Sequence, residues 1–289
     1  MQTDHLHYPY PSKRMTVHAR KGMVATAQPL AAQAGLSIMQ QGGNAIDAAI
    51  ATAACLTVVE PNSNSIGGDS FALVWTNGKL HGLNGSGPAP KNISIDKVKE
   101  KGYSSIPSQG ILPITVPGTP ASWVALSKRF GKLPLTDVLK PAIEYASNGY
   151  PVSAEIGGFW NIRYHENLEK YKGPEFDEWF RIYAPNGRAP RIGEIWKSPD
   201  HAKTLQAIAE TDAEAFYRGE LAEKIAQTVQ RHGGYLSKED LASYQPEWVD
   251  PIKINYKGYD VWEIPPNGQG IVALLALNIL KEFEFSAKD

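Results

Sequence analysis

The stretch from Gly35 to Pro90 constrains the fold most, because it combines the longest apolar run with two glycine pairs and a clear hairpin signal. A helical pattern covers residues 29–41, and Gly42-Gly43 then supplies the positive φ that favours a helix end. Asn44 is the expected N-cap of a second helix over residues 45–59. Nearly every position of that second helix is apolar or small, which predicts a helix buried on all sides and too short to span a membrane.

A β-hairpin is predicted next. Residues 71–75 carry apolar side chains at every position, which is typical of a strand covered on both faces. Asn77-Gly78 is the preferred pair for a type I′ turn, so residues 79–84 should pair back antiparallel. The returning strand brings Asn84, Gly85 and Ser86 to one edge of the sheet. A glycine-rich segment there can line a site, although a plain connector is the commoner use of such a loop.

Composition excludes several classes of partner. The 289 residues suffice for one large domain or two small ones, and the formal net charge of -1 gives no reason to expect nucleic acid or an anionic membrane surface. The single cysteine, Cys55, excludes a disulfide framework, and its apolar helix argues against a nucleophilic thiol. Residues 1–22 lack an apolar signal segment, so we expect an N-terminal surface arm and a cytoplasmic protein without a membrane partner.

The rest of the chain alternates helical patterns with short strands. Residues 24–27 predict a short strand, and Pro141 is expected to kink or split its helix. Residues 157–197 are rich in aromatic and charged side chains with weak periodicity, which indicates an insertion or flexible flap; packing explains these aromatics better than ligand stacking. The other expected elements are helices near 95–102, 120–130, 135–148, 199–210, 220–231 and 271–280, a Ser237–Asp240 capping box, and strands 252–256 and 259–264.

Known catalytic motifs are absent. The seven histidines show no metal-ligand spacing, and neither a Walker A sequence nor a dinucleotide fingerprint occurs, so no metal or cofactor is expected. Ser86 does not lie in a GxSxG nucleophile elbow. From the residues alone, the chain is an α/β or α+β protein with a candidate site at Asn84, Gly85 and Ser86, whose chemistry these residues do not define.

Eight segments, in order, resemble the large-subunit portion of the γ-glutamyltranspeptidase family of N-terminal-nucleophile hydrolases. They include GGNAIDAAIA, TVPGTPASW, LPLTDVLKPAIEYASNGYPV, GGYLSKEDLASYQPEW and PPNGQGIVALLALNIL, and the resemblance runs from about Gly22 to Phe283. It implies an α/β, four-layer αββα sandwich in which residues 23–289 form a C-terminally incomplete large-subunit part. The implied partners are the protein's own small subunit and a small γ-glutamyl amide such as glutathione.

The resemblance also implies autoprocessing before a threonine, whose freed α-amine then acts as base for its own hydroxyl. Backbone N–H groups would hold the oxyanion. That threonine is expected beyond Asp289, so no catalytic residue is expected within this chain, which alone should be inactive.

One departure concerns the loop at the strand end. The family has a Phe-Arg-Glu-x-Ala-Pro type pattern there, whose arginine binds the α-carboxylate of the γ-glutamyl group; here Ser86 stands at the arginine and Gly87 at the glutamate. A serine cannot supply a bidentate guanidinium. This loop is similar to that of the cephalosporin (glutaryl) acylase branch. A glutaryl amide acylase of the same fold and a non-catalytic large-subunit fragment are therefore the alternatives to a γ-glutamyl hydrolase.

Overall fold

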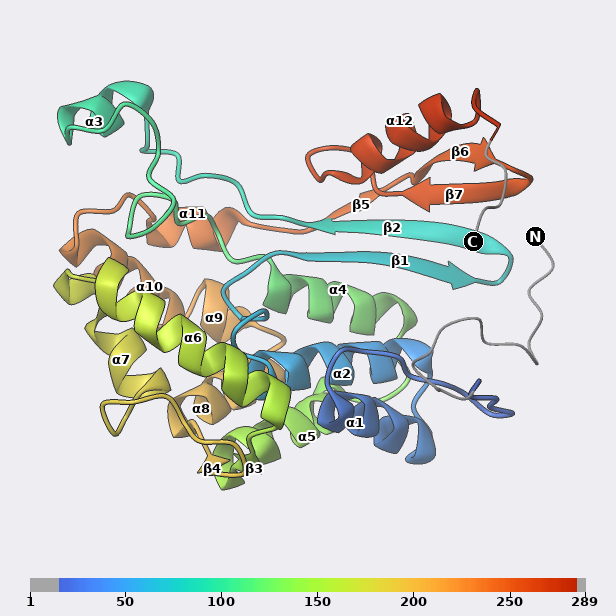
Figure 1. Ribbon diagram of the computed structural model, residues 1–289, viewed down its shortest axis with the longest axis horizontal. Helices are drawn as coiled ribbons and strands as arrows, with labels where there is room; N and C mark the ends of the chain where they lie inside the picture. Colours follow the sequence, from blue (N-terminus) through green and yellow to red (C-terminus); the bar gives the residue numbers. More distant parts are fainter. Residues whose placement is uncertain (1–15, 285–289) are drawn as a thin grey trace.

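The computed structural model describes residues 16–284, a mainly helical body beneath a small antiparallel sheet, with a second hairpin and further helices above it (Figure 1). Most of the expected N-terminal arm lies outside the described residues. The elements are α1 (Pro29–Gln40), α2 (Ala45–Val59), β1 (Ser70–Thr76), β2 (Lys79–Gly85), α3 (Ile95–Glu100), α4 (Thr119–Phe130), α5 (Leu135–Asn148), β3 (Tyr150–Pro151), α6 (Ala154–Lys170), the 3₁₀ turn η1 (Pro174–Phe176), α7 (Asp177–Tyr183), β4 (Ile195–Trp196), α8 (Pro199–Thr211), α9 (Glu214–Tyr217), α10 (Glu220–Arg231), α11 (Lys238–Ser243), β5 (Glu247–Val249), β6 (Ile252–Tyr256), β7 (Tyr259–Glu263) and α12 (Gly270–Leu280).

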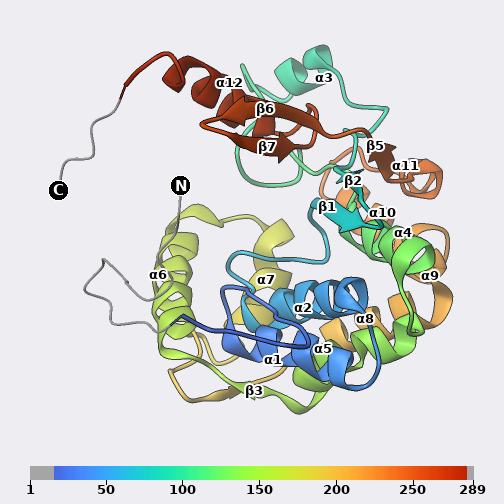
Figure 2. The same ribbon diagram turned by 90° about the vertical axis from the view of Figure 1, so that its right-hand side faces the viewer.

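The sheet that carries the candidate site has the strand order β1-β2-β5, with both pairs antiparallel. The predicted hairpin is confirmed: Asn77 and Gly78 have φ values of 51° and 74°, and the register pairs Thr76 with Lys79. A second hairpin, β6–β7, turns at Lys257-Gly258 in the same left-handed conformation. Helix α4 packs under β1 and β2, whereas α12 lies over β6 and β7 (Figures 1 and 2).

Helix α2 is the centre of the helical body, as its composition predicted. It packs against α1, α4 and α5, and most of its side chains are buried. Asn44 caps it through a reciprocal capping box with Asp47, whose carboxylate also accepts the backbone N–H of Lys132. Cys55 is fully buried, and this burial raises the pKa of its thiol, so the prediction that it is not a nucleophile agrees with its surroundings.

Three expectations about individual segments were wrong. Residues 24–27 form no strand, because no strand in the described part of the chain pairs with them. Helix α5 is continuous from Leu135 to Asn148 with Pro141 inside it, so the expected split does not occur and packing against α2 and α8 outweighs the break that proline favours; the alternative of a kink stays a prediction. Strand β1 is not covered on both faces, because Phe71, Leu73 and Trp75 are all exposed, Trp75 by 68%.

The segment predicted to be an irregular flap is instead largely helical. Its main element is the 17-residue helix α6, followed by η1, α7 and β4. The aromatics pack on one another as expected: Trp160 and Trp196 lie 5.1 Å apart between ring centroids, and Tyr183 stacks on Trp196. Trp160 Nε1 also donates to the carbonyl of Tyr183 at 3.0 Å. These contacts attach α6, α7 and β4 to one another.

A partly buried polar pair joins α2 to α8 and is expected to make stability sensitive to acid. Thr57 Oγ1 donates to the carbonyl of Ala54 at 2.7 Å, so His201 Nε2, 3.1 Å from that oxygen, donates to it from a neutral ring. Burial lowers the pKa of His201 from 6.5 to about 4. Between these values the unfolded chain binds more protons than the folded one, so stability falls as the pH drops.

We expect protonation linked to His201 to lower the unfolding free energy by about 3 kcal/mol between pH 7 and pH 4. Urea unfolding at a series of pH values should show this loss in the wild type, and His201→Gln, which keeps a donor, should reduce it. The matched control is His165→Gln on the exposed surface of α6. Parallel pH profiles for the wild type and His201→Gln would contradict the assignment.

Within residues 16–284, no helix is both long enough and apolar enough to cross a bilayer.

Candidate substrate-binding site

The predicted site residues lie together at the end of β2. Asn84 is buried, and its Oδ1 accepts the backbone N–H of Ser86 at 3.0 Å and the Ser86 hydroxyl at 2.8 Å. This turn, in which an asparagine side chain accepts the N–H two residues on, fixes the chain as it leaves the sheet. Gly85, the last residue of β2, pairs with Ser70 at the start of β1. The three residues therefore form one local unit that presents the Ser86 hydroxyl.

A residue that the sequence analysis missed completes this unit. Asn267, in the loop between β7 and α12, accepts from Asn84 Nδ2 at 2.8 Å and donates from its own Nδ2 to Ser86 Oγ at 2.9 Å. Asn267 is exposed, so its side chain forms the outer side of the cluster. The PPNGQG segment that contains it was noted only as part of the family resemblance. Periodicity could not reveal a contact between residues 181 positions apart.

The support beneath the cluster is built from close backbone contacts. A Cβ atom on Gly87 would lie 1.5 Å from the carbonyl oxygen of Val116, and one on Gly118 would lie 1.7 Å from that of Gly85. These glycines let the loop after β2 approach residues 116–118 closely, and Val116 N–H donates to the carbonyl of Pro88. Tyr244 adds a hydrogen bond from its hydroxyl to the Ser86 carbonyl at 3.3 Å.

Within residues 16–284, no Lys, Arg or His side chain hydrogen-bonds to Asn84, Ser86 or Asn267. Asp69 lies beside this cluster, and its Oδ1 accepts the backbone N–H of Gly87 at 3.2 Å. Burial, assisted by Asp69 and Glu247, raises the pKa of Tyr244 to about 12, so this hydroxyl stays a neutral donor. Asn84, Ser86 and Asn267 thus offer neutral donors and acceptors and no cationic partner for a carboxylate.

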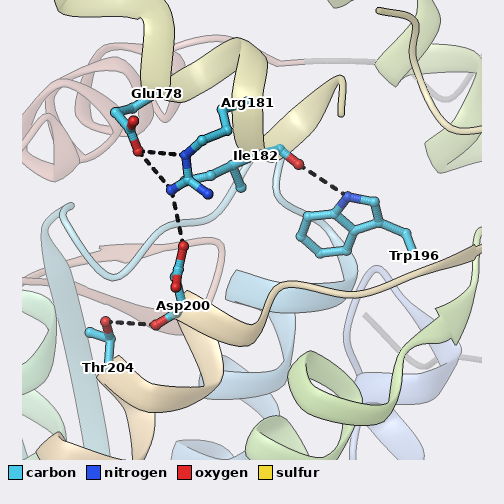
Figure 3. Close-up of polar contacts among 6 residues, drawn as sticks. All are labelled: Glu178, Arg181, Ile182, Trp196, Asp200 and Thr204. Carbon is cyan, nitrogen blue, oxygen red and sulfur yellow. Dashed lines mark hydrogen bonds and ion pairs between the residues drawn. The ribbon is translucent and has the colours of Figure 1, made fainter. Parts of the chain in front are cut away.

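A second group of polar side chains links α7 to α8 (Figure 3). Arg181 bonds to Glu178 at 2.6 Å and to Asp200 at 3.0 Å, and these hydrogen bonds raise the pKa of its guanidinium above the ordinary value. All three side chains are more than half exposed, as expected for a surface ion-pair network of little energetic weight. We interpret it as a structural tie between the two helices. Among the described residues, no group of His, Cys, Asp and Glu side chains has the arrangement of a metal site.

Comparison with known proteins identifies the family. The model of the gamma-glutamyltranspeptidase family matches residues 31–289, which is most of the chain. The chain therefore belongs to the γ-glutamyltranspeptidase family, whose fold it shares with solved transpeptidase and acylase structures.

Particular relatives refine this assignment. The glutathione hydrolase-like YwrD proenzyme of Bacillus subtilis is 42% identical over 275 residues, covering 94% of this chain and 51% of that protein. The crystal structure of a cephalosporin acylase from Bacillus halodurans is 58% identical, with a TM-score of 0.94, over 100% of this chain and 54% of the other. The γ-glutamyltranspeptidase of Helicobacter pylori is 30% identical, with a TM-score of 0.84, over 94% of this chain and 78% of the other. The chain thus spans about half the length of the first two.

Proposed function

We propose that the complete protein is a γ-glutamyltranspeptidase-like hydrolase and acyltransferase, of which this chain is the large-subunit part. The observation that carries the proposal is the family match over residues 31–289. In this proposal, a threonine outside the chain attacks the amide, and its acyl ester passes to water or to an amine. The candidate site at Asn84, Gly85 and Ser86, together with Asn267, then contacts the acyl group.

The proposed small-subunit partner accounts for the exposed apolar faces. Strand β1 hydrogen-bonds only to β2 among the described strands, and its Phe71, Leu73 and Trp75 side chains are exposed. Helix α12 is apolar almost throughout, yet among its residues only Leu274 is buried, and Ile279 is 62% exposed. An open strand edge and apolar surfaces of this kind favour association. We propose that the partner covers them and completes a four-layer αββα sandwich.

Two acyl groups are candidates. The γ-glutamyl group of amides such as glutathione is the first, on the basis of the family and of relatives named glutathione hydrolases. A glutaryl-type group, which has no α-amino acid head, is the second. Two findings favour the second: no cation among the described residues hydrogen-bonds to Asn84, Ser86 or Asn267, and the structure at 58% identity is a cephalosporin acylase.

The proposal predicts that the 289-residue chain alone is inactive, whereas the chain combined with a threonine-led small subunit cleaves amides. Both preparations should be assayed against γ-glutamyl and glutaryl p-nitroanilides. Turnover by the chain alone that persists through repurification would show that the nucleophile lies within it. An inactive combined protein that has been correctly processed would contradict the proposed hydrolase.

A further inference from the structure

A cavity of about 250 Å³ lies between α6, α7 and the turn after α2, and none of its lining residues belongs to the cluster at Ser86. The four polar or charged residues that α6 contributes are Arg163, Glu166, Asn167 and Lys170. Their spacing places them on one side of the helix. Trp179 and Tyr183, one turn apart on α7, form the facing wall. Different elements build this cavity and the cluster at Ser86, so the proposal for this cavity does not rest on the proposed acyl transfer.

The aromatic walls of the cavity are held in place by contacts with one another and with residues outside it. Tyr183 stacks on Trp196, and Trp160 donates its indole N–H to the Tyr183 carbonyl. Trp196 Nε1 donates to the carbonyl of Ile182, and Arg181 ties α7 to Asp200 on α8 (Figure 3). Helix α7 is therefore positioned before any ligand arrives. Because a preformed wall loses little conformational entropy on binding, even a small ligand can bind there.

The polar side of the cavity contains an unused hydrogen-bonding group. Asn167 is only 8% exposed, yet its carboxamide has no hydrogen bond to any described residue. The Asn167 carboxamide lines the cavity with its donor and acceptor unused by the described residues, so a molecule in the cavity can hydrogen-bond to it. Such a molecule must also fit beside the aromatic rings.

The charges around Asn167 favour an anionic partner. Arg163 Nη1 lies 2.7 Å from Glu166 Oε2 and Lys170 Nζ lies 3.7 Å from the same oxygen, so two cations share one carboxylate. The hydrogen bond from Arg163 lowers the pKa of Glu166, which keeps that carboxylate ionised and leaves one positive charge in excess. A ligand carboxylate can accept from Asn167 and from the cations at once, through charge-assisted hydrogen bonds.

We propose that this cavity is a binding site for a small planar aromatic carboxylate. Its ring lies against Trp179 and Tyr183, and its carboxylate accepts from Asn167 Nδ2 and from Arg163 or Lys170. A volume of about 250 Å³ is below the range usual for drug-sized ligands, so the ligand is a single-ring molecule. The aromatic ring and the carboxylate of the ligand contribute separately to binding, so each contribution can be tested.

The test is calorimetric and ligand-observed NMR titration of the full-length protein with benzoate. We expect saturable binding with a Kd below about 10 mM. Acetate, which lacks the ring, and benzyl alcohol, which lacks the charge, should each bind at least about tenfold more weakly. Equal binding of benzyl alcohol would overturn the carboxylate part of the proposal, and equal binding of acetate would overturn the aromatic part.

Variants assign the binding to this cavity. Asn167→Leu keeps a side chain of similar volume and should weaken benzoate binding about tenfold. Arg163→Gln removes an exposed cation and should weaken benzoate binding about fivefold. The matched control is Arg218→Gln, which breaks a similar ion pair with Glu214 near α9 and should leave binding unchanged. A melting temperature near that of the wild type shows that a variant is folded. Trp179→Leu, which removes part of the aromatic wall, is a second variant that tests binding in the cavity independently of Asn167. No binding to the wild type, or binding unaffected by Asn167→Leu and Trp179→Leu, would overturn the proposal.

Discussion

Replacing Gly87 by alanine is expected to lower the unfolding free energy by about 4 kcal/mol, more than a typical core substitution. The added Cβ would lie 1.5 Å from the Val116 carbonyl oxygen and 2.5 Å from its carbon, and backbone atoms cannot move aside as a flexible side chain does. Relief requires separating the loop after β2 from residues 116–118. That movement would break the hydrogen bond from Val116 N–H to the carbonyl of Pro88.

Urea unfolding measures this effect, with Gly67→Ala as the matched control. Gly67 precedes β1 in a neighbouring turn, and a Cβ there would meet no heavy atom within 4 Å. Its substitution should change stability by no more than about 0.5 kcal/mol. Equal stabilities for the two variants at equal m-values would mean that the approach of Gly87 to Val116 is not as close as described.

The sequence predicted helices α1 and α2 and the β1–β2 turn well because local signals there agree with tertiary packing. Asn44 caps α2, and the apolar composition of that helix requires burial from every side. Asn77-Gly78 determines its turn through backbone conformation alone. The burial of β1 was mispredicted for a physical reason: a run of apolar residues shows that a strand is to be covered, but not whether the covering layer belongs to the same chain. Phe71 and Trp75 are apolar and exposed here.

The candidate site was predicted only in part. Asn84, Gly85 and Ser86 are adjacent in sequence, so one strand end brought them together, and the structure shows them in one hydrogen-bonded turn. Asn267 reaches the same turn from a distant loop, and only the tertiary fold makes that contact. Helix α6 was missed because charged residues that line the cavity beside α7 interrupt its apolar positions. This interruption weakens the helical period of the sequence.

Ser86→Arg is expected to raise the preference for γ-glutamyl over glutaryl donors about tenfold to a hundredfold in the complete protein. An arginine at the end of β2 would add a cation to the cluster, and a charge-assisted bond to an α-carboxylate is worth about 1.5–3 kcal/mol. Glutaryl amides have no such carboxylate and gain nothing. The wild type, with Ser86 bonded to Asn84 and Asn267, should tolerate or prefer glutaryl donors.

The measurement is the ratio of kcat/KM for the two donors, because a ratio cancels any general loss of activity when the Ser86 hydrogen bonds are broken. Ser86→Ala is the matched control: it loses the hydroxyl, gains no cation, and should leave the ratio within about threefold. A neighbouring glutamate cannot assist the new arginine, since even a Cβ at Gly87 would clash with Val116. The gain should therefore fall toward the lower end of the range. If the wild type already strongly favours γ-glutamyl donors and Ser86→Arg leaves the ratio unchanged, another residue recognises the acyl group and the turn at Ser86 has only a structural role.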